Sequence, residues 1–202
     1  MKKITKISIA ILFFAAIASC TKDNMRTAST QQSTNQSAQN ATDGVQAVHR
    51  IGDSFGGGII FYLDSTKQHG LVVTSSDLDA NGEFQIRWYN GTYKSTGATA
   101  TTLGTGAQNT AKIVKAQGSG TYAAQLCSDL VLNGFSDWYL PSKAELNKLY
   151  LHKGKVPGLG ATNYWSSSEY GKMRSWDQEF GGGFQFKDDK SFTLRVRAIR
   201  SF

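Results

Sequence analysis

The chain has 202 residues, 40% of them hydrophobic and 18% charged, which is enough for one domain of ordinary size with tails. Three of the 22 basic residues lie at positions 2, 3 and 6, so from residue 20 onward 19 basic residues face 15 acidic ones and the net charge is +4. This weak excess, without a run of five basic residues, argues against a nucleic-acid partner. Two cysteines are too few for a disulfide framework or a cysteine-based zinc site.

The N-terminus has the pattern of a lipoprotein signal peptide, which we place at residues 1–19. Three lysines precede an uncharged apolar run, residues 7–17, that is too short to cross a membrane. The ending Ile17-Ala18-Ser19-Cys20 resembles the bacterial lipobox, in which the peptide is cut before the cysteine and the thiol receives a lipid. We therefore expect Cys20 to anchor the protein to a membrane. An ordinary signal peptide with a coincidental cysteine is the alternative.

Residues 20–44 are expected to be the lipidated N-terminus and a disordered tether. They are rich in Ser, Thr, Gln, Asn and Ala, and their one sizeable apolar residue is Met25. The Lys22-Asp23 pair resembles the surface-export signals of Bacteroidetes lipoproteins. We accordingly expect the protein at the bacterial outer membrane, facing the cell surface. The remaining residues, 45–202, are long enough for a domain with its own core.

The first half of this domain shows strand patterns followed by helix patterns. Short runs of β-branched and aromatic residues predict strands, and apolar residues at helical spacing predict helices. The helical stripe that contains Cys127 makes this thiol a buried structural residue. A Ser-x-x-Glu capping box marks the start of the last helix. The expected strands are 57–64, 69–76 and 84–90, and the expected helices are 109–117, 121–132 and one that begins at Ser142.

The C-terminal third returns to strand patterns. Gly181-Gly182 and Asp188-Asp189 are turn signals, and they predict that the last three strands form an antiparallel meander. The expected strands are 163–170, 173–180, 183–189 and 191–202.

Three motifs resemble sites that carry chemistry. The Gly52–Phe61 segment resembles a phosphate-binding loop, but it lacks the Lys-Ser/Thr pair and leads into a strand, which favours a tight turn. The oxygen-rich Asp77–Glu83 segment lacks the ligand order of an EF-hand, which favours a solvated turn over calcium. Ser136 in "GFSDW" lacks the second glycine of a nucleophile elbow. We therefore expect no catalytic residue, no metal and no cofactor.

The aromatic and basic residues are the remaining candidates for a binding site. Each tryptophan has two interpretations, core packing or a platform for a sugar ring, and core packing is favoured. Strand alternation places Arg195 and Arg197 on one face of the closing strand. Together with neighbouring basic residues they predict a patch for sulfate or carboxylate groups, and an ordinary solvated sheet face is the alternative. The predicted patch consists of Arg195, Arg197, Lys172, Arg174, Lys187 and Lys190.

The order of motifs resembles one known family. The segments are "GDSFGGGIIFYLD", "HGLVV", "NGFSDWYLPSKAELNKLY", "YWSSSEY" and the closing "VRAIRSF", and they span nearly all of residues 51–202. They are similar to the C-terminal domain of the Legionella collagen-like adhesin. The resemblance implies an α+β, C-type-lectin-like fold, with a mainly antiparallel sheet, two to three flanking helices and long loops.

The resemblance also implies that the domain is displayed on a bacterial surface and adheres to sulfated glycosaminoglycans. We therefore expect a non-catalytic domain that binds an anionic glycan or an extracellular matrix ligand. The adhesin is a trimer, but this chain lacks its collagen-like repeats, so a homo-oligomer stays open. The alternatives are a structural subunit of a cell-surface assembly and an enzyme that acts on cell-surface polymers.

Overall fold

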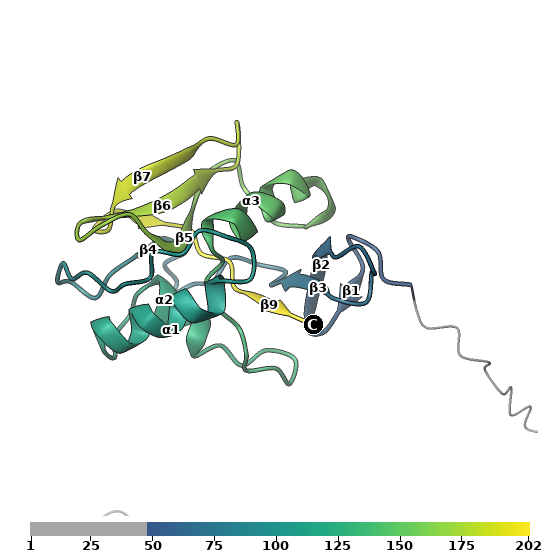
Figure 1. Ribbon diagram of the computed structural model, residues 1–202, viewed down its shortest axis with the longest axis horizontal. Coiled ribbons are helices and arrows are strands. Elements are labelled where there is room, and N and C mark those ends of the chain that lie inside the picture. The colour runs from purple at the N-terminus through teal and green to yellow at the C-terminus, as the bar shows by residue number, and fades with distance from the viewer. Residues whose placement is uncertain (1–47) are drawn as a thin grey trace, which may run out of the picture. The chain divides into compact units, whose positions relative to one another are not determined.

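The computed structural model describes residues 48–202, which belong to a compact unit that begins at Val45 (Figure 1). The predicted signal peptide, Cys20 and the tether lie outside the described residues. The described chain contains no helix that is long and apolar enough to span a bilayer. Its elements are β1 (Ser54–Phe55), β2 (Gly58–Leu63), β3 (Gly70–Val73), β4 (Ile86–Arg87), α1 (Gly106–Gln117), α2 (Ala123–Ser128), α3 (Lys143–Leu151), a 3-10 turn (Lys153–Lys155), β5 (Asn163–Glu169), β6 (Arg174–Glu179), β7 (Gln185–Asp189), β8 (Thr193–Leu194) and β9 (Ile199–Ser201).

The first sheet has the strand order β1-β2-β3-β9, and all its pairs are antiparallel. Gly56 and Gly57, at φ of 54° and 83°, form the turn between β1 and β2, which confirms a tight turn in place of a phosphate-binding loop. A Cβ atom on Gly57 would lie 2.7 Å from the Phe135 ring, so only glycine fits against that ring.

The second sheet is the antiparallel meander β5-β6-β7, as the turn signals predicted for its last two strands. The closing segment, residues 191–202, does not extend this meander, which corrects the prediction that the last three strands form one. β8 pairs with β4, and β9 pairs with β3. Between β8 and β9, backbone carbonyls of the closing segment accept hydrogen bonds from the amides of Trp165, Leu78 and Thr74 in turn. The closing segment therefore crosses from one end of the domain to the other and joins all the sheets (Figure 1).

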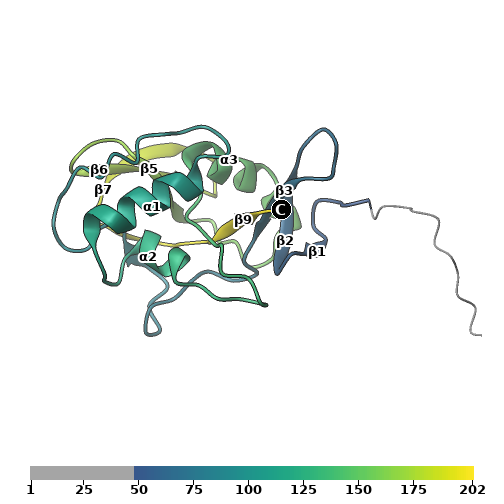
Figure 2. The same cartoon turned by 60° about the horizontal axis from the view of Figure 1, so that its bottom comes forward.

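The helices lie beside the sheets, with α1 and α2 packed against each other and α1 against β5 (Figure 2). The helix predicted at 121–132 is shorter than expected and ends at Ser128. Asn133 and Gly134, both at positive φ, form a turn that brings Leu132 and Phe135 together. The capping box at Ser142 is confirmed, because Ser142 Oγ accepts from the Glu145 amide and Glu145 accepts from the Ser142 amide.

The core consists of two clusters of apolar residues, one on each side of the closing segment. Trp88, Trp138 and Trp165 are buried in the first cluster, so the core interpretation holds for three of the four tryptophans. Cys127 is buried in the same cluster, and burial raises the pKa of its thiol. Observed helices with mainly antiparallel sheets confirm the α+β class.

Candidate functional site

The alternation of the closing segment is confirmed, but its basic side faces the interior. Arg197 is buried and donates to the Asp77 carboxylate, the Thr74 carbonyl and the Pro157 carbonyl. Arg195 donates to the other oxygen of Asp77, and its side chain is 36% exposed. Arg197 is therefore a structural residue that cannot contact a surface ligand. Alternation predicts which side chains share a face, and it does not reveal that a carboxylate from another loop covers that face.

Lys190 is the second predicted ligand residue that the structure places in the interior. Its ammonium group is fully buried, bonded to Glu169 and to the carbonyls of Lys94 and Lys172, and 4.3 Å from the centroid of the Trp88 ring. Burial lowers the pKa of Lys190, and the Glu169 carboxylate opposes that shift. Lys190 therefore fixes loops in place and is not available to a surface ligand.

The remaining predicted cations, Lys172, Arg174 and Lys187, are exposed at the β5-β6-β7 sheet. Lys187 lies directly opposite Trp176 in the register of β6 and β7. Its Nζ lies 4.9 Å from the centroid of the Trp176 ring and 4.0 Å from that of Tyr170. Tyr170 is 51% exposed, so this cation and its aromatic partner are both open to solvent.

Lys143 completes this group, and sequence reasoning missed it. It is the first residue of α3, and its Nζ lies 3.5 Å from the centroid of the Trp176 ring. The capping box predicts where α3 begins, but no local pattern predicts that this helix start meets β6. We define the cationic–aromatic face as Lys143, Tyr170, Lys172, Arg174, Trp176 and Lys187.

The electrostatics of the cationic–aromatic face leave its lysines free to bind anions. The four ion pairs within residues 48–202 use Lys190, Arg195, Arg197 and Arg200. None of these belongs to the face. An aromatic ring holds a lysine at the surface through its quadrupole without neutralising the charge. The lysines of the face can therefore donate to sulfate or carboxylate groups.

A polar depression of about 280 Å³ adjoins the face. Gln185 donates to the Lys143 carbonyl, and Gln178 donates to Asn147, so the amide side chains are held in fixed orientations. Hydroxyl groups of a sugar can bond to such amides. The depression is lined by Thr101, Lys143, Ala144, Asn147 and Gln185.

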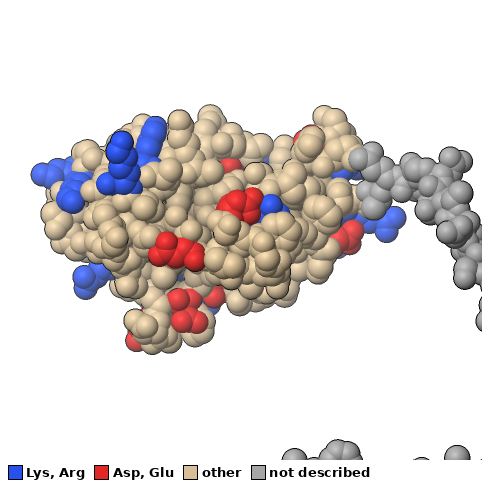
Figure 3. Space-filling view, turned by 90° about the horizontal axis from the view of Figure 1, so that it is seen from below, with Lys and Arg blue, Asp and Glu red and all other residues tan. Residues whose placement is uncertain are grey.

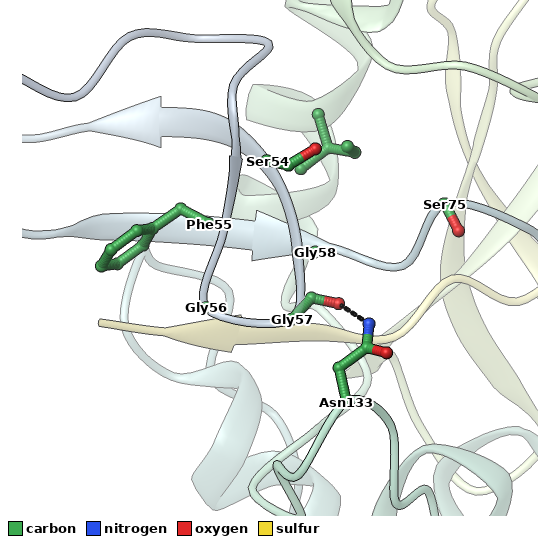
Figure 4. A pocket seen from close by; sticks show the side chains of 8 residues that line it. Ser54, Phe55, Gly56, Gly57, Gly58, Ser75 and Asn133 are labelled. Atoms are coloured by element: carbon green, nitrogen blue, oxygen red, sulfur yellow. Dashed lines mark hydrogen bonds between the residues drawn. The ribbon is translucent and has the colours of Figure 1, made fainter. Parts of the chain in front are cut away.

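A second depression, of about 380 Å³, lies over the β1–β2 turn (Figure 4). Asn133 Nδ2 donates to the Gly57 carbonyl, and Arg200 Nη1 donates to the Gly56 carbonyl. Arg200 is itself held by both oxygens of Asp137, and its hydrogen bond lowers the pKa of that carboxyl. Asp137 thus serves an ion pair, and the depression, lined by serine, glycine and asparagine together with Phe55 and Ile59, offers no titratable group.

The acidic segment at 77–83 does not gather into a metal site. Asp77 is bonded to two arginines, and Asp79 accepts from the Gly82 amide within a turn. Across residues 48–202, no three His, Cys, Asp or Glu side chains are grouped to hold a metal ion.

These features define an α+β domain with mainly antiparallel sheets, a buried network of ion pairs and a surface on which two lysines lie on aromatic rings. The family model of the Lcl C-terminal domain matches residues 77–200, from the Asp77 carboxylate to Arg200. The chain therefore belongs to the Lcl C-terminal domain family, which confirms the resemblance to the Legionella collagen-like adhesin. Membership indicates an adhesin-like domain of a surface-exposed protein. A search of curated proteins found no match.

Proposed function

We propose that this domain binds anionic glycans, such as sulfated glycosaminoglycans, without catalysis, and that the cationic–aromatic face is the binding site. One observation carries the proposal: Lys143 lies on the half-buried ring of Trp176, Lys187 lies on the exposed ring of Tyr170, and neither lysine has a carboxylate partner among residues 48–202. Sulfated sugars present both charges and ring faces, which match cations and aromatic platforms.

The proposal includes a C-type-lectin-like arrangement and attachment to the outer membrane through a lipid on Cys20. The pairing of β9 with β3, which places the last strand of the chain in the same sheet as the first strands of the domain, supports the first part. The lipobox-like sequence supports the second. Loss of palmitate labelling in Cys20→Ala tests the anchor, and unchanged labelling would rule it out.

Heparin chromatography tests the binding site. The variant Lys143→Gln/Lys187→Gln should elute at clearly lower salt than the wild type, because it removes two cations from the face and keeps the helix propensity of α3. Arg50→Gln/Lys155→Gln is the control, since it makes the same change in net charge at exposed residues that precede β1 and end the 3-10 turn. Equal elution of the two double variants would show that the face is not the site.

One observation favours the alternative of a structural subunit. Phe184 and Phe186 are 66% and 45% exposed, and their ring centroids lie 6.4 Å apart. Exposed apolar neighbours are typical of contact surfaces between proteins. Self-association that increases with concentration in sedimentation experiments, and that Phe184→Ser/Phe186→Ser abolishes, would support this role.

A further inference from the structure

A second group of cations lies around α1. Lys112 and Lys115 are three residues apart and so lie on one side of this helix. They line a depression of about 450 Å³ together with Thr96, Gly97 and Ala116. Lys94 joins them, because its Nζ donates to the Ala116 carbonyl at 3.1 Å. We call Lys94, Lys112 and Lys115 the α1 cluster.

The α1 cluster is not neutralised by nearby acids. The sequence of α1 contains no acidic residue. None of the ion pairs found among residues 48–202 involves Lys94, Lys112 or Lys115. In Figure 3 most of the visible basic side chains gather toward the left end, where Figure 1 places α1 and α2, and acidic side chains lie nearer the middle.

A buried ion pair connects the α1 cluster to the cationic–aromatic face. The Glu169 carboxylate accepts from the amides of Thr96 and Gly97, which line the depression. Tyr170 of the face follows Glu169 directly. Lys190, the partner of Glu169, donates to the carbonyls of Lys94 and Lys172, one from each group of cations. The two groups are therefore neighbours, fixed to the same buried pair.

We propose that the α1 cluster is a second subsite and that the ligand is an extended, linear polyanion that contacts both groups of cations at once. This inference rests on the proposed function and adds to it the length of the ligand. Each exposed charge contact is weak by itself. A polyanion that is bound at one group of cations presents its next charges to the other group at high effective concentration. A short fragment cannot reach the second group and gains nothing from it.

The test measures the affinity of the domain for full-length heparin and for a short heparin oligosaccharide by titration calorimetry. Three double variants are compared with the wild type: Lys112→Gln/Lys115→Gln, Lys143→Gln/Lys187→Gln and the control Arg50→Gln/Lys155→Gln. Glutamine keeps the helix propensity of α1. Circular dichroism and thermal unfolding verify that each variant is folded.

For full-length heparin, we expect each of the first two variants to lose roughly three- to tenfold in affinity relative to the control. Their salt dependence should also become shallower, since fewer anions are contacted. For the short oligosaccharide, the Lys112/Lys115 variant should bind almost as the control does. The increase in affinity from the short oligosaccharide to full-length heparin should therefore be smaller for the Lys112/Lys115 variant than for the control.

The outcomes separate this inference from the proposed function. If Lys112→Gln/Lys115→Gln matches the control on full-length heparin while Lys143→Gln/Lys187→Gln weakens, the second subsite is wrong and the proposed site stands. If neither differs from the control, the proposed site itself is wrong. An oligodeoxynucleotide of matched charge that competes as well as heparin would overturn the assignment to a glycan polymer.

Discussion

Lys190 is a cation whose role is opposite to the one that its sequence position indicates. It follows the Asp188-Asp189 turn signal, where lysine is normally solvated, yet it is buried against Glu169 and Trp88. Its three oxygen partners come from two segments of the chain, the loop at Lys94 and the β5–β6 hairpin that contains Glu169 and Lys172. A buried ammonium with all its donors satisfied holds those segments in one arrangement.

Replacement of Lys190 by methionine should therefore strongly destabilise the folded state. The Glu169 charge would stay buried without its partner, which costs about 3–5 kcal/mol in the free energy of unfolding. Urea denaturation measures this cost. Lys187→Gln, on the exposed side of β7, is the matched control and should stay within about 0.5 kcal/mol of the wild type.

The double variant Lys190→Met/Glu169→Gln should recover part of the loss, because glutamine removes the charge and keeps an acceptor for the Thr96 amide. A cost below about 1 kcal/mol for Lys190→Met alone would contradict the structural role of the buried pair.

Among the elements, α3 is the one whose beginning is best determined by local sequence. Ser142 accepts from the Glu145 amide and donates to the Thr102 carbonyl at 2.8 Å, so it also fastens the loop before α1. Glu145 in turn accepts from the Gly104 amide. Burial raises the pKa of this carboxyl, although its hydrogen bonds oppose the shift.

The variant Ser142→Ala should lose about 1–2 kcal/mol in the free energy of unfolding, because it removes the cap and one of the two hydroxyl donors to the Thr102 carbonyl, which keeps only Thr105. Thermal and urea unfolding provide the measurement. Ser128→Ala, at an exposed position of α2, is the comparison and should be nearly neutral. Equal effects of the two substitutions would show that the capping box does not contribute to the free energy of unfolding.

The elements also show where sequence reasoning succeeds and where it fails. Local patterns predict β2, β3, the start of α3 and the β5-β6-β7 strands, because turns, caps and alternation depend on neighbours in the chain. They do not predict that Arg197 meets Asp77 or that Lys143 meets Trp176, because these contacts join segments far apart in sequence. A cation's burial is decided by such contacts, so only part of the predicted patch is exposed.

At the scale of the whole molecule, stability should depend on pH through Asp177. This residue is buried in β6, its Oδ2 accepts from Asn163, and its Oδ1 has no hydrogen-bond partner within residues 48–202. Burial raises its pKa from 3.8 to about 6. The folded state therefore holds the proton more tightly than the unfolded chain, and the stabilisation present below pH 3.8 is lost as the pH rises through 6.

Asp177→Asn removes this dependence, because the amide does not ionise. The difference in unfolding free energy, variant minus wild type, should increase between pH 4 and pH 6 and remain level above that range. Urea denaturation at a series of pH values measures the difference. A difference that is independent of pH, or that decreases as the pH rises, would show that the pKa of Asp177 is not raised in the folded state.

The closing segment, residues 191–202, has a mechanical consequence for the proposed adhesion. The described chain enters the domain beside β1, and the cationic groups lie toward the opposite end (Figure 1). Tension between an anchored N-terminus and a bound ligand would run along the long axis of the domain. The closing segment spans that axis, and its arginines are clamped to Asp77 and Asp137. With the anchor and the ligand as proposed, these ion pairs would bear the load that would otherwise pull the two halves apart.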